Sequence, residues 1–570
     1  MKKPIIQFEN FGFKYRSQAQ PTLHDINLTI YEGEKVLIVG PSGSGKSTLA
    51  HCINGLIPHS YKGEKTGSLK MNGQEVYNQS IFERSKMVGT VLQDPDSQFI
   101  GITVAEDIAF SLENDCTPQD EMVNRVSQVA KLVEMDEFLS ASIHHLSGGQ
   151  KQRVSLGGVM VDNVDILLFD EPLANLDPAT GKHAIDLIDD IQKETNKTIV
   201  IIEHRLEDVL HSKVDRIIVV NEGKIVCDAI PNELLSSTVL EENNLREPLY
   251  VKALKYAGCE VTPEIEPEHI HKVKVENCKD KLQSWFEAIN AKKHSSNEPI
   301  ALELQNISFG YDSDKQILHN ISFSIQKGEM ISIVGKNGAG KSTLSKLICG
   351  FERPSTGKIL LNGRDITDDS IKERAEKIGI VMQNPNHMIS KHLIFDEVAF
   401  GLKVRGIPEK EIEERVEKTL KICGLYPFRK WPINALSFGQ KKRVTIASVL
   451  VMNPEVLILD EPTAGQDFRH YTEIMEFLVE LNKLGVTIMM ITHDMHLMLE
   501  YTPRGIAISN GEKIADDTAA NLLTDERVIK KANLKETSLF ELALRSGISQ
   551  PREFVQQFIH YDREVRHRWQ

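Results

Sequence analysis

The chain has 570 residues, of which 26% are charged and 41% hydrophobic, and its formal net charge is −14. This length exceeds the needs of one small domain and provides for two or more large cores. The composition is that of an ordinary globular protein, which excludes a collagen, a disordered acidic tail and a protein lying mainly inside a membrane. The acidic balance makes the chain a poor candidate for wrapping nucleic acid, so we expect no nucleic-acid partner.

No apolar run approaches the ~18 residues that a membrane span requires. The N-terminal residues 1–7 contain two lysines but no apolar signal-peptide core, so we expect the protein in the cytosol or on a cytosolic membrane face. The seven cysteines are scattered and are never spaced C-x-x-C. We interpret them as reduced thiols rather than as a zinc site or a disulfide framework.

The sequence repeats itself at a spacing of about 290 residues. A glycine-rich segment at 40–47 recurs at 335–342, and three shorter segments recur in the same order. Self-similarity at a nearly constant spacing indicates one domain duplicated within the chain. The shorter segments are 146–150 with 436–440, Asp170-Glu171-Pro172 with Asp460-Glu461-Pro462, and His204 with His493.

The repeats set the predicted domain boundaries. We expect a first domain with a short helical extension at 4–260, a linker at 261–298, a second domain with a similar extension at 299–547, and a tail at 548–570. The first copy has extra residues at about 58–65, which predict a polar surface loop.

The pattern G-x-x-x-x-G-K-[ST] occurs in both copies, each time between an apolar run and a helical pattern. Such a loop points backbone N–H groups at phosphate oxygens, and the following helix adds the positive end of its dipole. Lys46 and Lys341 should reach the β- and γ-phosphates of ATP, and Ser47 and Ser342 should hold Mg²⁺. The predicted ATP-binding loops comprise Gly40, Pro41, Ser42, Gly43, Ser44, Gly45, Lys46, Ser47 and Thr48, and Gly335, Lys336, Asn337, Gly338, Ala339, Gly340, Lys341, Ser342 and Thr343.

Two apolar runs, at 166–169 and 456–459, end in an Asp-Glu pair. Continuous apolar runs are typical of central parallel strands, whose carboxyl ends face the ligand in open α/β sheets. Asp170 and Asp460 suit Mg²⁺ binding. Glu171 and Glu461 suit a base that orients or deprotonates the attacking water.

With these motifs in place, residues 146–153 resemble the signature of ATP-binding-cassette (ABC) ATPases. The second copy, 436–443, has Phe438 in place of Gly148 but keeps Ser437 and Gly439. The resemblance covers both repeats and implies an α/β fold with two tandem P-loop NTPase domains. Each domain would have a mainly parallel sheet core, an antiparallel β subdomain and a helical signature subdomain.

The resemblance also implies roles for further residues. Gln93 and Gln383, followed by Asp94-Pro95 and Asn384-Pro385, resemble the Q-loop glutamines, which contact Mg²⁺ and the attacking water. His204 and His493 look like the switch histidines that touch the γ-phosphate. Tyr15 and Tyr311 resemble the aromatic residue that stacks on adenine.

In this family the two domains face each other head to tail, with two ATP molecules between them, and we expect this pairing within one chain. Because both copies keep the Glu and the His, we predict two sites that hydrolyse ATP. One site would use Lys46, Ser47, Gln93, Asp170, Glu171 and His204, completed by Ser437 and Gly439; the other would use Lys341, Ser342, Gln383, Asp460, Glu461 and His493, completed by Ser147 and Gly149.

Finer features, including 93–98, 103–110 and Glu203-His204-Arg205, resemble the ATPases of energy-coupling-factor (ECF) transporters, which import vitamins and metal ions. This resemblance implies a peripheral protein on the cytoplasmic side of the cell membrane, whose partners are a membrane scaffold and a substrate-binding membrane protein. Met388 stands where the first copy has Gln98, so the two halves are not interchangeable.

Two other functions remain open for a tandem ABC ATPase. A soluble ribosome-associated protein is the main alternative, but such proteins typically have basic linkers, whereas residues 246–300 hold nine Lys or Arg and nine Asp or Glu. A DNA-repair ATPase is disfavoured because the chain shows no inserted coiled coil or zinc module.

Overall fold

The computed structural model describes residues 2–93, 95–174, 176–289, 298–311 and 316–569. Asp94 of the first Q-loop motif and residues 290–297 of the predicted linker lie outside the described residues. One compact unit comprises Met1–Trp285 with Asp467–Arg469 and Arg545–Gly547; the other comprises Phe286–Gln466, His470–Leu544 and Ile548–Gln570. Among the described residues, no helix combines the length and the apolar character that a membrane span requires.

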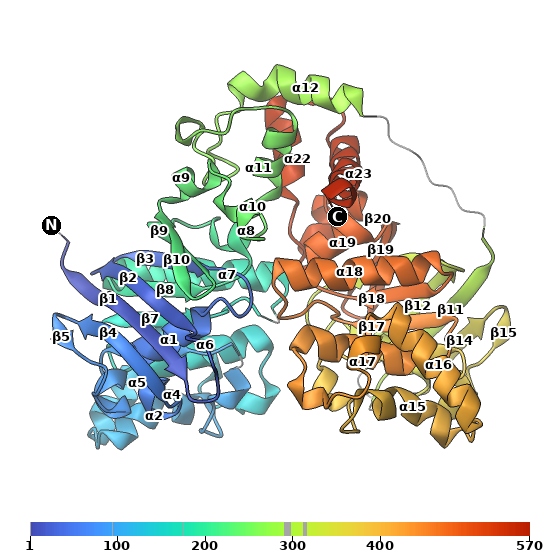
Figure 1. Cartoon of the computed structure of the whole chain (residues 1–570), viewed down its shortest axis with the longest axis horizontal. Coiled ribbons are helices and arrows are strands. Elements are labelled where there is room, and N and C mark those ends of the chain that lie inside the picture. The colour runs from blue at the N-terminus through green and yellow to red at the C-terminus, as the bar shows by residue number, and fades with distance from the viewer. Residues whose placement is uncertain (1, 94, 175, 290–297, 312–315, 570) are drawn as a thin grey trace. The chain divides into compact units, whose positions relative to one another are not determined.

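Each unit is built around a six-stranded sheet, coloured blue to green in the first unit and yellow to red in the second (Figure 1). Five strands of each sheet pair in parallel and the sixth pairs antiparallel at one edge. In spatial order the first sheet has β6 (Val88–Val91), β7 (Ile166–Asp170), β8 (Thr198–Ile202), β3 (Lys35–Val39), β9 (Arg216–Asn221) and β10 (Lys224–Ala229). The second has β16 (Ile378–Val381), β17 (Val456–Asp460), β18 (Thr487–Ile491), β13 (Met330–Val334), β19 (Arg504–Ser509) and β20 (Glu512–Thr518).

A smaller antiparallel sheet accompanies each central sheet, and the strand order is again the same in both units. In the first unit it contains β2 (Leu23–Tyr31), β1 (Pro4–Tyr15), β4 (Gly63–Met71) and β5 (Gln74–Glu75). In the second it contains β12 (Leu318–Gln326), β11 (Ile300–Phe309), β14 (Thr356–Leu361) and β15 (Arg364–Asp365). Apolar side chains from each small sheet join those of the neighbouring parallel strands in one buried core. The predicted fold class, two tandem P-loop NTPase domains, is confirmed.

The prediction of a surface loop at 58–65 is wrong at both ends of the segment. Residues 56–59 form helix α2 (Leu56–His59), and β4 already begins at Gly63. The reason is that β1 is long enough to pair with the extra residues, because Tyr15 lies opposite Gly63 and Lys14 opposite Glu64.

Several helices begin at a residue whose side chain accepts from a free N–H group of the first turn. Ser147 and Ser437 form capping boxes with Gln150 and Gln440, and Asp177 caps a helix that starts with a proline. Besides α2, the helices of the first domain up to Val209 are α1 (Lys46–Asn54), α3 (Ile81–Ser85), α4 (Val104–Asn114), α5 (Gln119–Leu132), α6 (Gly148–Met160), α7 (Pro178–Thr195) and α8 (Leu206–Val209). Their counterparts are α13 (Lys341–Cys349), α14 (Ile371–Arg374), α15 (Ile394–Val404), α16 (Glu409–Ile422), α17 (Phe438–Leu450), α18 (Phe468–Lys483) and α19 (Met495–Tyr501).

Helical extensions follow both domains. The first contains α9 (Pro231–Leu235), α10 (Val239–Glu242), α11 (Leu249–Tyr256) and α12 (Lys279–Ala288), so the segment predicted as a linker is folded over most of its described length. The second contains α20 (Ala519–Leu522), α21 (Glu526–Ala532), α22 (Ser538–Ser546) and α23 (Pro551–Trp569). In α23 the side chains of Phe554 and Phe558 are fully buried, and Arg566 pairs with Glu500 of α19 at 3.2 Å.

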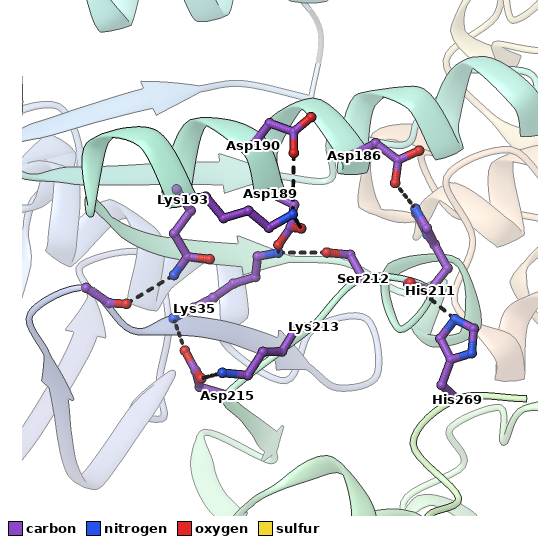
Figure 2. A network of polar contacts seen from close by, with 12 residues as sticks. Lys35, Asp186, Asp189, Asp190, Lys193, His211, Ser212, Lys213, Asp215 and His269 are labelled. Atoms are coloured by element: carbon purple, nitrogen blue, oxygen red, sulfur yellow. Dashed lines mark hydrogen bonds and ion pairs between the residues drawn. The ribbon is translucent and has the colours of Figure 1, made fainter. Parts of the chain in front are cut away.

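A buried ion pair joins the central sheet to α7 in the first domain (Figure 2). Lys35, the first residue of β3, is only 1% exposed, and its Nζ lies 2.7 Å from Oδ1 of Asp189. The same Nζ donates to Oγ of Ser212 at 3.0 Å, and Asp189 also pairs with Lys193 at 2.6 Å. Burial lowers the pKa of Lys35, and the interaction with Asp189 opposes that shift.

The second domain replaces this ion pair with apolar residues. Met330 is the first residue of β13 and Val479 occupies the position in α18 that Asp189 has in α7. Both side chains are buried. The same framework therefore accepts either a charged or an apolar pair at this point.

Candidate ATP-binding sites

The first phosphate loop connects β3 to α1. Gly45 lies in the left-handed region at φ 106°, where a glycine is favoured, and precedes the helix. Nζ of Lys46 donates to the backbone oxygens of Gly40 (2.7 Å) and Pro41 (2.8 Å), so the lysine folds back over its own loop. The hydroxyl of Ser44 is buried and has no hydrogen-bond partner among the described residues, which fits a loop built to receive phosphate oxygens.

The second phosphate loop has the same geometry between β13 and α13. Gly340 has a φ of 99°, and Nζ of Lys341 donates to the backbone oxygens of Gly335 (2.7 Å) and Lys336 (3.0 Å). Oγ of Ser342 lies 3.4 Å from Oδ2 of Asp460. A hydroxyl beside a carboxylate is a donor set that suits Mg²⁺.

In the first domain the predicted catalytic residues come together at the carboxyl ends of β7 and β8. Oε1 of Glu171 lies 2.7 Å from Nε2 of His204, and Nε2 of Gln93 donates to Oε2 of Glu171 at 2.5 Å. Glu171 is held at a positive φ of 52°. Such strained backbone is found preferentially at functional sites.

The corresponding carboxylate of the second domain is held slightly differently. Glu461 also has a positive φ, 46°, but its Oε1 contacts Nδ1 of His493, at 2.6 Å, instead of Nε2. The buried Thr492 donates from Oγ1 to Oε2 of Glu461 at 3.4 Å. The first domain has Glu203 at that position, and its buried carboxylate accepts from backbone N–H groups, including that of Leu173 at 3.1 Å.

Burial shapes the electrostatics of both sites. It raises the pKa of Asp170 to about 6, and the adjacent Glu171 contributes in the same direction. The pKa of Asp460 is also raised by burial and by its neighbour Glu461. Burial alone would raise the pKa of Glu171, but the hydrogen bond with His204, together with the charge interactions of His204, Lys46 and Arg205, outweighs it and lowers the pKa below its usual value. Glu171 is thus ionised at neutral pH, as a base must be.

The tyrosines predicted to stack on adenine lie at the ends of β1 and beyond β11. Tyr15 is half-buried, packs edge-on against Phe13 and shares a 3.1 Å hydrogen bond with Oγ1 of Thr48. Tyr311 packs in the same way on Phe309 but is 52% exposed. Stacking on adenine stays a prediction for both residues.

The signature residues lie at helix N-termini in both domains. Oγ of Ser147 accepts from the backbone N–H of Gln150 (3.4 Å) at the start of α6, and Oγ of Ser437 accepts from that of Gln440 (3.3 Å) at the start of α17. Gly149 and Gly439 belong to the first turns of these helices. Helix N-termini are suited to bind phosphate.

Lys442 and Thr492 were not among the residues predicted to form the sites. Lys442 is buried beneath the second Q-loop and donates to the backbone oxygen of Gln383 at 2.8 Å. A comparison of the two halves of the sequence could have identified these residues, because the first half has Gln152 at the position of Lys442 and Glu203 at the position of Thr492.

Comparisons with known proteins agree with this geometry. A family model described as ABC transporter matches residues 23–174 and 318–464, and one described as ATP-binding cassette cobalt transporter matches residues 237–309. A putative ABC transporter ATP-binding protein of Clostridium perfringens is 62% identical over 565 residues, covering 99% of this chain and 100% of that protein. One of Enterococcus faecalis is 59% identical over 570 residues, covering 99% and 100%.

Among solved structures, CbiO1 of Clostridium perfringens, described as part of the ABC transporter complex CbiONQ, is 40% identical. The match covers 41% of this chain and 95% of that one, with a TM-score of 0.38. From the family models and the curated relatives, the fold and the paired motifs are those of ABC ATPases. The chain belongs to the family of ABC transporter ATP-binding proteins and is an ATPase that binds ATP.

The first domain is expected to take up protons when it binds ATP at about pH 8.5. Burial lowers the pKa of Lys46 to about 8, while the nearby Glu171 opposes that shift, so at this pH part of the free lysine is neutral. Phosphate oxygens favour the charged form and raise the pKa on binding. Calorimetric titration of ATP without Mg²⁺, in two buffers of different ionisation enthalpy, measures the uptake.

The matched control is Lys46→Arg, whose guanidinium stays charged throughout this pH range. The native chain should take up more protons than this variant at about pH 8.5, and the two should converge at about pH 6.5. Equal uptake at the higher pH would show that Lys46 is already charged in the free protein.

Proposed function

We propose that the chain is the ATP-hydrolysing subunit of an energy-coupling-factor type importer, which delivers a vitamin, a vitamin precursor or a metal ion across the cell membrane. The observation that carries this proposal is the match of residues 237–309 to a family described as ATP-binding cassette cobalt transporter. The ECF-like sequence features around the first Q-loop and His204 support the same subtype.

We propose that each domain supplies one set of hydrolytic residues. Lys46 binds the β- and γ-phosphates, Glu171 accepts a proton from the attacking water, and His204 keeps Glu171 in place while contacting the γ-phosphate. Ser47, Gln93 and Asp170 would hold Mg²⁺, which when bound neutralises charge on the phosphates. The second set consists of Lys341, Ser342, Gln383, Asp460, Glu461 and His493.

We further propose that the domains pair head to tail within the chain and bind two ATP molecules. Ser437 and Gly439 would complete the first site, and Ser147 and Gly149 the second, each through a helix N-terminus that faces phosphate. Binding of ATP would close the pair and hydrolysis would reopen it, so that the movement is passed to membrane partners.

The surface next to the first Q-loop suits contact with a membrane partner. Ile100 and Ile102, between the Q-loop and α4, are 63% and 72% exposed. Exposed apolar side chains that gather in one region mark interaction sites. The positions equivalent to Ile100 and Ile102 in the second domain hold Ser390 and His392, so each domain would receive a different partner segment.

Co-purification of the tagged chain from detergent-solubilised cells tests the proposal, with partners identified by mass spectrometry. We expect a polytopic scaffold protein and a small integral-membrane protein, and the ligand of the latter would identify the substrate. Ile102→Glu should reduce their recovery, whereas Val123→Glu, at another exposed apolar position in α5, should not. Recovery of ribosomes without membrane proteins would instead establish the soluble alternative.

A further inference from the structure

The two Q-loops, residues 93–98 and 383–388, are held by different side chains. In the first, Gln98 accepts from the backbone N–H of Leu92 (2.9 Å) and donates to the backbone oxygen of Thr90 (3.1 Å). In the second, Met388 takes that position, and its sulfur lies 3.1 Å from the backbone nitrogen of Met382. A thioether is a weak acceptor and donates nothing. The second loop therefore lacks the clamp that Gln98 provides.

The signature helices also reach the Q-loops by different contacts. In the first domain Lys151 of α6 pairs with the exposed Asp96 at 2.6 Å. Its neighbour Gln152 donates to the backbone oxygen of Pro172. In the second domain the contact passes to Lys442, which stands at the position of Gln152.

Lys442 is 1% exposed and its ammonium group is satisfied by the Q-loop backbone. Nζ donates to the carbonyl oxygens of Met382 and Gln383, both at 2.8 Å. Burial lowers the pKa of Lys442 to about 8. The carboxylates of Asp460 and Glu461 oppose this shift, so the ammonium group interacts electrostatically with both of them. A buried ammonium is costly unless its hydrogen bonds are made, so these contacts constrain the loop strongly.

We propose that Lys442 is a positioning residue for ATP hydrolysis in the second domain. By fixing the carbonyl of Gln383, it replaces the missing Gln98-type clamp and sets the direction in which the Gln383 side chain leaves the backbone. In the first domain the equivalent Gln93 reaches the catalytic carboxylate of Glu171. The inference deepens the proposed function, because it rests on the proposed role of Gln383.

Amide hydrogen exchange in the full-length chain tests the positioning directly. Lys442→Gln introduces the residue that the first domain has at this position, and should speed exchange of residues 382–388 by about 10-fold or more as the loop opens more often. The matched control, Lys441→Gln, changes the neighbouring lysine of the same helix and should leave this exchange unchanged. Unchanged exchange in Lys442→Gln would overturn the proposal.

ATP turnover then shows whether Lys442 acts through Gln383. Lys442→Gln should lower kcat of the second site by about 10- to 100-fold, as loss of a supporting contact does around metal sites, with little change in KM for ATP. When Lys442→Gln is combined with Gln383→Ala, kcat should fall no further than in Gln383→Ala alone. Additive losses would mean that its charge acts directly on Asp460 and Glu461, which would overturn the proposal.

Two further variants separate this role from folding and from the proposed function. Adding Met388→Gln to Lys442→Gln should slow the loop exchange again and restore part of the turnover, because it rebuilds the clamp of the first domain. If Lys442→Gln does not fold, Lys442→Met keeps the side-chain length and the same exchange and turnover results are required of it. If Gln383→Ala keeps full turnover, the role of Gln383 fails, whereas the exchange result still decides whether Lys442 holds the loop.

Discussion

Replacing Glu171 and Glu461 together by Gln is expected to lower ATP turnover by about 10²- to 10⁴-fold, the usual contribution of a general base. Oε1 of Glu171 lies 2.7 Å from His204 and Oε1 of Glu461 lies 2.6 Å from His493, and both carboxylates are at positive φ. Glutamine has nearly the same shape and keeps a hydrogen-bonding oxygen. ATP binding should therefore persist while hydrolysis fails.

Each single variant separates the two sites. Since both keep the Glu and the His, Glu171→Gln or Glu461→Gln alone should leave roughly half of the turnover if the sites act independently. Phosphate release from saturating ATP measures the rates, and equilibrium nucleotide binding serves as the control for folding. Complete loss in one single variant would show that the sites are strictly coupled or unequal.

Replacing Lys35 by Met is expected to destabilise the first domain by about 1–3 kcal/mol, because it removes the buried partner of the Asp189 carboxylate, which is 16% exposed and keeps its contact with Lys193. The double variant Lys35→Met, Asp189→Val reproduces the pair found at Met330 and Val479, and should return the stability to within about 1 kcal/mol of the native chain. Scanning calorimetry of the full chain measures the shift, at about 2–4 °C per kcal/mol for a domain of this size.

Lys193→Met is the matched control, because Lys193 pairs with the same carboxylate but is 67% exposed, and it should change little. If the loss of stability in the double variant equalled the sum of the losses in Lys35→Met and Asp189→Val, the ion pair between Lys35 and Asp189 would not be the cause. Burial raises the pKa of Asp189, but hydrogen bonds from Lys193 and Lys35 outweigh it and bring the pKa to about 2. Its stabilisation is therefore complete above the ordinary pKa of 3.8 and lost as the pH falls towards 2.

The fold class and the ATPase family could be predicted because their signals are local in sequence. A glycine-rich loop between a buried strand and a helix, or an apolar strand that ends in Asp-Glu, has few alternatives. The resemblance to ABC ATPases also placed Gln93, Glu171 and His204 in one site, but it did not predict that Gln93 and His204 contact Glu171 directly. Their catalytic roles stay predictions.

What could not be predicted depends on partners distant in sequence. Residues 58–65 looked like a loop because polarity alone does not show that β1 extends far enough to pair with them. Nothing in the sequence around Lys35 indicates an ion pair, because only the fold brings Asp189 to it. Lys442 looked like one more basic residue of a signature helix, and its burial depends on the path of the Q-loop above it.

The alternative pairs, Lys35 with Asp189 and Met330 with Val479, have a consequence for the gene that encodes both halves. Recombination between duplicated segments tends to make them uniform. An exchange that carried the codon of Lys35 in β3 without that of Asp189 in α7 would leave one charge without its partner, and the product would be less stable. The codons of Lys35 and Asp189, more than 150 apart, must therefore be exchanged together or both kept, which favours lasting divergence of the halves at these positions.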